Sequence, residues 1–332
     1  MGFALVPVTM QTVFTEARQV AFIGGYNATP HNRSRTFSVD VVDNRDEIRE
    51  FLVTRRAKIT PEQAGVPSYG GARRVPGLRR EEVAMLAGVS TDYYTRLEKG
   101  NINGVSDSVL EAVSRVLQLD EAERAHLADL AAAAKPSRTP RRRPSPQQVK
   151  PSIQRALDSM VATPAFVRNG RLSILATNLL GRALYSPVFD NPKHQGNIAR
   201  FNFLDPRALD FHPNWNEAAN TTVSLLRTEA GRDPYDRELT DLVGELATRS
   251  EEFRTRWAAH NVRLHHTGLK HFDHPAVGRL DLAFDSMELP TEAGLSMTIY
   301  SAEPGTASED RIKLLASWAA TQETAAATRT GA

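Results

Sequence analysis

The sequence predicts an all-α domain followed by an α+β domain, and three observations support this. Apolar residues recur at helical spacing in five segments between residues 43 and 134. Residues 135–151 then contain five prolines and no carboxylate, which is typical of an extended linker. Beyond residue 152, a hairpin signal and three further strand-like segments are interspersed with helical ones. The length of 332 residues also favours two domains.

The segment from Arg80 to Lys99 has the pattern of a helix-turn-helix. Gly88 is expected to end its first helix, and Ser90 to cap the second. We expect Ala84 and Gly88 to be small because two helices that cross after so short a turn bring their backbones close together. The inward apolar positions are Val83, Ala84, Ala87, Tyr94 and Leu97.

Hydrogen-bonding and cationic side chains occupy the outward positions of the second helix, and arginines precede the first. Such groups suit the base edges and phosphates of a DNA major groove. The alternative is an ordinary helical hairpin with solvated charges. The candidate DNA-binding residues are Arg73, Arg74, Arg79, Arg80, Ser90, Thr91, Asp92, Tyr93, Thr95, Arg96 and Lys99.

Three further helices complete the first predicted domain, residues 43–134. One begins at Asp43 or Asn44 and ends near Lys58, and a loop rich in Gly and Pro follows over residues 61–78. Ser106 and Asp120 are predicted to cap the other two. Residues 1–42 show no clear pattern, which predicts a poorly ordered extension or a misplaced start codon.

The second domain is predicted over residues 152–320, followed by a disordered tail at 321–332. Its hairpin would place strands 165–168 and 171–175 on either side of Asn169-Gly170. An antiparallel sheet is the expected arrangement. Helices are predicted at 152–160, 178–185, 215–230, 236–246, 250–260 and 311–319, and strands at 268–273, 277–284 and 295–301.

Composition limits the class of protein. The net charge is only +2, so DNA binding would depend on local clusters of basic residues. Cysteine is absent, which excludes disulfides and thiolate sites. We find no signal peptide, membrane-spanning run, phosphate-binding loop, serine elbow or zinc-protease motif. A cytoplasmic protein that is not an enzyme is therefore expected.

Five histidines lie close together in sequence between residues 260 and 274. Imidazoles gathered in this way could hold zinc or nickel. However, His271 falls in a predicted strand, where only alternate side chains share a face. We therefore expect surface or core histidines and no metal site. The five are His260, His265, His266, His271 and His274.

From about Asp43 to Ala319 the chain resembles the MmyB-like regulators, a branch of the XRE-type helix-turn-helix transcription factors. The resemblance rests on VPGLRREEVAMLAGVSTDYYTRLEKG (residues 75–100), FLDPRALDFHPNW (203–215), AGRDPYDRELTDLVGEL (230–246), SEEFRTRWAAHNV (250–262), HPAVGRLDL (274–282) and YSAEPGTASEDRIKLLASWA (300–319). It implies a λ-repressor-like five-helix DNA-binding domain, a PAS-like ligand-binding domain and fatty-acid-like ligands.

The resemblance also implies roles for individual residues. Arg80 would touch phosphate, with Ser90 and Tyr93 near the DNA backbone. The residues expected to reach bases are Thr91, Asp92 and Arg96. Glu98 would form a structural ion pair with Arg55 or Arg56.

We therefore expect a regulator that binds a double-stranded operator, as a homodimer, and is controlled by a small apolar ligand, with no cofactor beyond such a ligand. Regulators of this motif class bind two half-sites about one helical turn apart, which favours a dimer. The alternative function of the second domain is protein interaction or dimerisation. Aromatic and leucine residues at helical spacing are the candidate ligand-binding residues, although such residues are more often core: Phe201, Phe203, Phe211, Trp215, Leu225, Leu226 and Trp257.

Overall fold

The computed structural model describes residues 44–66, 75, 77–135, 148–263, 265–292 and 294–330. The predicted extension at 1–42, most of the predicted linker, and the candidates Arg73 and Arg74 lie outside these residues. Among the described residues, every helix is too short or too polar to span a bilayer.

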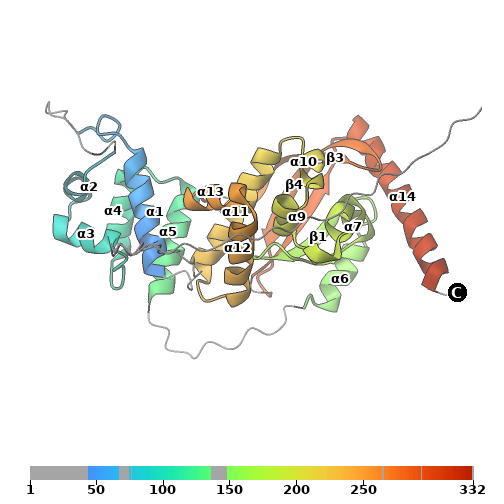
Figure 1. The fold of residues 1–332 in the computed structure, drawn as a ribbon, viewed down its shortest axis with the longest axis horizontal. Helices are drawn as coiled ribbons and strands as arrows, with labels where there is room; N and C mark the ends of the chain where they lie inside the picture. Colours follow the sequence, from blue (N-terminus) through green and yellow to red (C-terminus); the bar gives the residue numbers. More distant parts are fainter. Residues whose placement is uncertain are drawn as a thin grey trace, which may run out of the picture. The chain divides into compact units, whose positions relative to one another are not determined.

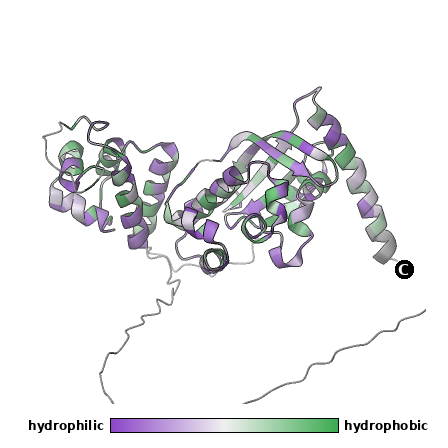
Figure 2. Ribbon diagram, turned by 45° about the horizontal axis from the view of Figure 1, so that its top comes forward, coloured by the Kyte–Doolittle hydropathy of each residue, from purple (hydrophilic) through white to green (hydrophobic). Residues whose placement is uncertain are grey.

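The first domain consists of five helices, as predicted (Figure 1). They are α1 (Asn44–Lys58), α2 (Arg80–Ala87), α3 (Thr91–Glu98), α4 (Asp107–Val116) and α5 (Glu121–Ala134). Hydrophobic and hydrophilic residues alternate along these helices, as expected where each buries one side (Figure 2). Their inward side chains, among them Phe51, Val83, Tyr94 and Leu97, form one core.

The predicted caps are present in this domain. The Ser90 hydroxyl accepts a hydrogen bond from the backbone N–H of Tyr93 at 3.1 Å. Ser106 caps α4 in the same way, and Asp120 forms a capping box with Glu123 at the start of α5. Each cap satisfies backbone N–H groups that have no partner within their helix.

Gly88 is required for a different reason from the one that the sequence pattern suggests. A Cβ atom at this position would meet no atom within 4 Å, so the two helices do not approach closely here. Gly88 instead adopts φ +70°, the left-handed conformation that ends α2. The expectation of close backbone approach at Gly88 is wrong, and the turn selects glycine through its backbone angle.

We expect Gly88→Ala to lower the free energy of unfolding by about 1 kcal/mol, because alanine is strained in the left-handed region. Gly88→Asn should cost less, since asparagine tolerates this conformation. Urea unfolding of the two variants checks this. Equal losses for alanine and asparagine would show that backbone strain is not the cause.

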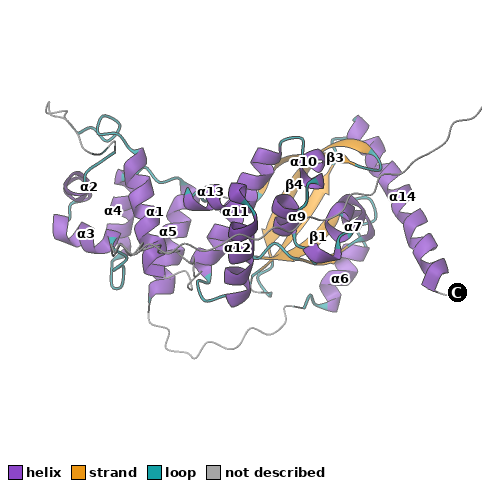
Figure 3. Ribbon diagram, in the orientation of Figure 1, coloured by secondary structure: helices purple, strands orange, loops and turns teal. Residues whose placement is uncertain are grey.

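The second domain is an antiparallel sheet with helices packed on it (Figure 3). Its strands are β1 (Ala165–Asn169), β2 (Ile174–Thr177), β3 (Thr267–His274), β4 (Gly278–Glu288) and β5 (Leu295–Ser301). The order in the sheet is β2-β1-β5-β4-β3. This confirms the predicted α+β class and matches the PAS-like expectation.

The predicted helices are present, and shorter ones join them between β2 and α11. The helices are α6 (Pro151–Asp158), α7 (Leu179–Leu184), α8 (Ser186–Phe189), the 3₁₀ turn η1 (Pro192–His194), α9 (Ile198–Leu204), α10 (Arg207–Phe211), α11 (Trp215–Arg232), α12 (Arg237–Arg249), α13 (Glu251–Ala258) and α14 (Ala307–Thr330). Since α14 continues to Thr330, the predicted disordered tail from residue 321 is wrong for residues 321–330.

The hairpin of β1 and β2 is present, but its turn is not the expected two-residue one. β2 starts only at Ile174, so the loop is longer than Asn169-Gly170. Leu172, whose side chain is buried, takes the left-handed conformation with φ 63°. The Asn169 side-chain oxygen accepts a hydrogen bond from the Ser173 N–H at 3.0 Å. Burial of Leu172 thus outweighs the local preference of Asn-Gly for a tight turn.

The two faces of the sheet are covered differently. One face carries aromatic and leucine side chains that pack against residues of α7, α9, α10 and α14. The other face, over β1 and β5, packs against Leu157 of α6. Alternate residues of β1 divide between the faces, with Phe166 on the first and Val167 on the second.

Candidate functional site

Helix α3 presents a polar surface to solvent. Thr91, Asp92, Arg96 and Lys99 are exposed, while Tyr94 and Leu97 anchor the helix from the inner side. The Arg96 guanidinium lies 6.0 Å from the centre of the Tyr93 ring. The exposed Arg96 side chain thus lies beside Tyr93.

The other described candidates lie around this helix. Arg79 is half-exposed before α2 and makes a long ion pair with Glu81 at 3.5 Å. Thr95 and Tyr93 are partly buried. The Ser90 oxygen is engaged as the α3 cap, which places this residue at the helix N-terminus.

Glu98 holds the helix-turn-helix to the rest of the domain. Its side chain is 1% exposed and accepts hydrogen bonds from Arg56 at 2.9 and 3.1 Å and from Arg80 at 3.1 and 3.3 Å. Arg55 and Arg56 were both expected as possible partners of Glu98. In the structure Arg56 is the partner, whereas Arg55 pairs with Glu123. Because Glu98 also engages Arg80, this arginine is a structural partner as well as a half-exposed cation.

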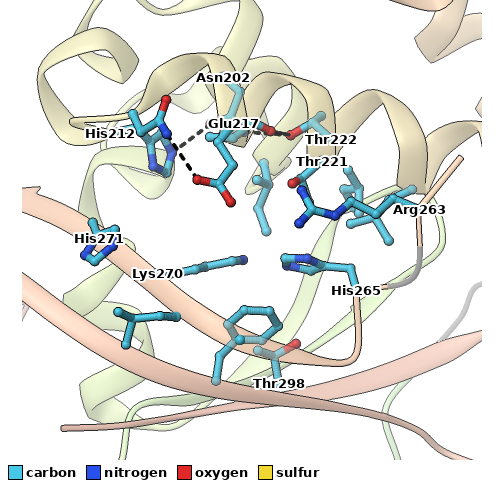
Figure 4. A pocket seen from close by; sticks show the side chains of 18 of the residues that line it. Asn202, His212, Glu217, Thr221, Thr222, Arg263, His265, Lys270, His271 and Thr298 are labelled. Carbon is cyan, nitrogen blue, oxygen red and sulfur yellow. Dashed lines mark hydrogen bonds between the residues drawn. The ribbon is translucent and has the colours of Figure 1, made fainter. Parts of the chain in front are cut away.

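A cavity of about 200 Å³ lies in the second domain between α11 and the sheet (Figure 4). Glu217, Thr221 and Thr222 line it from α11, and Lys270 and Thr298 line it from β3 and β5. Apolar walls come from Phe166, Leu172, Ile198, Leu225 and Phe284.

Lys270 is the central charged group of this cavity. Its amino group lies 4.8 Å from the centre of the Phe284 ring and 3.4 Å from the Tyr300 hydroxyl. The pKa of Lys270 is lowered to about 7, chiefly by burial and also by the nearby Arg168, while Glu217 opposes this shift. Figure 4 shows Lys270 and His265 pointing toward the same space.

Among the described residues that line the cavity, the basic side chains of Lys270, Arg168 and Arg263 outnumber the carboxylate of Glu217. Arg168 lines the cavity, and its side chain donates a hydrogen bond to the backbone oxygen of Asn169 at 3.3 Å. Within the described part of the chain, neither Lys270 nor Arg168 forms an ion pair with a carboxylate. Burial lowers the pKa of His212 to about 3 and that of His265 to about 2, so both rings are neutral at physiological pH.

Residues 149–315 match the MmyB-like transcription regulator ligand binding domain, and residues 54–127 match a helix-turn-helix domain. The chain belongs to the MmyB-like transcription regulators. It joins a helix-turn-helix to a ligand-binding domain, which is the arrangement of a ligand-regulated transcription regulator. A comparison with curated proteins found no significant match.

Of the seven ligand-binding candidates in this MmyB-like chain, Leu225 lines the cavity, and the other six do not. Phe201 and Phe211 belong to the core over the sheet, and Leu226 to the core between α11 and α12. Phe203, Trp215 and Trp257 are partly buried and pack against these cores. They shape the domain around the cavity and do not border it.

Lys270 is not among the residues predicted from the sequence, although its position in β3 carries a signal. Lys270 shares a face of β3 with the buried Phe272 and His274. Burying a charged side chain on such a face costs free energy, which makes Lys270 a candidate functional residue. The histidines of this region have separate surroundings. His265 stacks on Phe284, His271 pairs with Asp281, His274 contacts the Ala183 oxygen, and His260 lies next to α1.

Proposed function

We propose that this regulator reads an operator with the outward residues of α3. The supporting observation is the position of Thr91, Asp92 and Arg96 on the exposed side of a helix whose other side is fully buried. A recognition helix placed in this way presents its N-terminal residues to base edges in the major groove. Arg79 and Lys99 flank it and would neutralise phosphates.

Arg96→Ala is expected to reduce affinity for the best operator by about 1–3 kcal/mol and to relax base preference at one position. Arg79→Ala should instead weaken binding to all duplexes about equally. It should also reduce the slope of log affinity against log salt concentration by about 1. Binding-site selection from randomised DNA, followed by titration at several salt concentrations, compares the two. Identical losses on every sequence would show that α3 is not the reading helix.

For the ligand, we propose a small apolar molecule with an acidic group, such as a fatty acid. Lys270 and Arg168 offer two cations in a partly apolar cavity, which a carboxylate would complement. A second cavity of about 600 Å³ shares Arg168, Leu225, Arg263 and His265 with the first, and it provides room for a longer ligand.

The direct test of this ligand class is mass analysis of what purified protein releases on extraction, together with calorimetric titration of laurate. An acyl chain in the extract or saturable binding of laurate is the expected result. A clean extract with no binding of laurate would reject the fatty-acid class.

The regulator is proposed to act as a cytoplasmic homodimer, associated with the nucleoid when bound to DNA. Two copies would engage two half-sites of an operator. The alternative is that the second domain serves protein interaction or dimerisation without ligand sensing. This function does not require a cavity. Sedimentation of the full chain with and without laurate separates the two, since a pure dimeriser keeps the same state and binds no laurate.

A further inference from the structure

A buried ionic cluster joins α11 of the ligand-binding domain to α1 of the DNA-binding domain. Arg227 of α11 is 0% exposed and pairs with Glu47 of α1. It also contacts His260 Nδ1 at 2.8 Å and donates to the backbone oxygen of Trp257. Its guanidinium lies 4.0 Å from the centre of the Trp257 ring. An arginine enclosed in this way fixes the position of both helices.

Close packing extends this contact to α5. A Cβ atom at Gly231 of α11 would lie 2.5 Å from the His126 ring, which is itself buried against Phe51. Only glycine therefore allows α11 to approach α5 at this point. Arg232, the next residue, pairs with Asp129 of α5 at 3.3 Å.

The segment after α13 makes a second connection. Val262 is buried within the hydrophobic core of the five-helix domain. The backbone oxygen of His260 accepts a hydrogen bond from Arg55 of α1. Lys58 reaches the Asn261 side chain at 2.9 Å. The DNA-binding domain thus incorporates part of the ligand-binding chain in its own core.

Both connecting segments also line the cavity. On α11, Ala218, Thr221 and Leu225 face the cavity, and Arg227 lies two residues further along the same helix. In the second segment, Arg263 and His265 line the cavity directly after Val262. A ligand that moves either segment must therefore move a group buried against α1 or α5.

We propose that the docking surface around Arg227, Gly231 and Val262 is the route by which ligand occupancy changes the DNA-binding domain. The inference rests on the proposed function and specifies its regulation. Interdomain coupling requires that the ligand bind two arrangements with different affinity. A tightly packed interface of this kind responds to small shifts by repacking and does not deform continuously.

Hydrogen exchange of peptides from α1 and α5, followed by mass spectrometry, tests the route in the full chain. Laurate is one perturbation, and Ala218→Phe, which fills the cavity without any ligand, is the other. Thr248→Phe, on the exposed surface of α12, is the matched control. Both perturbations should change the rate of amide hydrogen exchange in α1 or α5 by about fivefold or more, which is the lower end of typical coupling between two sites. The control should change it by less than twofold.

A reverse perturbation checks the same route and protects the test against a misfolded variant. Gly231→Ala, at the interface, should change the rate of amide exchange in β3, which borders the cavity, and should alter the affinity for laurate. Calorimetry reports separately whether laurate binds. If laurate fails to bind but Ala218→Phe and Gly231→Ala act across the domains, the fatty-acid class is wrong and the route stands. If neither variant acts across the interface, the route is wrong, whether or not laurate binds.

Discussion

Glu47→Ala is expected to lower the free energy of unfolding by about 3–5 kcal/mol, because it leaves Arg227 buried without its carboxylate partner. The Glu47 carboxyl is almost fully buried. Burial raises its pKa, but Arg227, His126 and His260 hold that pKa well below its ordinary value. The charged pair is therefore an integral part of the interface.

The double variant Glu47→Ala/Arg227→Met should recover part of this loss, since it removes both charges and leaves no unpaired ion. Arg232→Met is the matched control. Its pairs with Asp129 and Glu288 are half-exposed, so we expect a loss of at most about 1 kcal/mol. Urea unfolding of the four proteins measures these effects. If Glu47→Ala is as stable as Arg232→Met, Arg227 is not buried and enclosed at this interface.

Lys270→Met is expected to weaken binding of laurate by about 10- to 100-fold, because a hydrogen bond to a charged group contributes about 1.5–3 kcal/mol. Methionine keeps the apolar length of the side chain and removes only the amino group. Lys193→Met, at an exposed position, is the control and should bind like the original protein. Calorimetric titration gives the dissociation constants.

The pH dependence provides a second check on Lys270. Its pKa in the empty cavity is about 7, so the cationic form that attracts a carboxylate is present below pH 7 and is lost above it. Affinity for laurate should therefore fall as pH rises from 6 to 8, by at most tenfold per pH unit, while Lys270→Met shows no such change. Equal pH profiles for the two proteins would place the carboxylate elsewhere.

Much of the fold could be predicted because local signals agree with tertiary packing. Ser90, Ser106 and Asp120 are caps both by residue type and in the structure. The helix-turn-helix follows from Tyr94 and Leu97 at inward spacing. The loop between β1 and β2 could not be predicted from Asn169-Gly170. The burial of Leu172 determines this loop, and that burial depends on residues far away in the sequence.

The cavity of the second domain was harder to predict than the exposed surface of α3. A surface on one helix depends on residues that are neighbours at helical spacing, such as Thr91, Asp92 and Arg96. The cavity instead combines α11 with β3 and β5, whose residues are far apart in sequence. Similarly, Glu98 could be assigned to an ion pair, but whether Arg55 or Arg56 is its partner depends on how α1 and α3 pack.

We propose that a molecule held beside Lys270 alters how α3 engages DNA. The most direct measurement is the affinity of the full-length chain for a selected operator duplex, at fixed salt concentration, without laurate and with saturating laurate. We expect the dissociation constant to differ by at least about fivefold between the two conditions. An unchanged dissociation constant, with laurate shown by calorimetry to be bound, would contradict this coupling between Lys270 and α3.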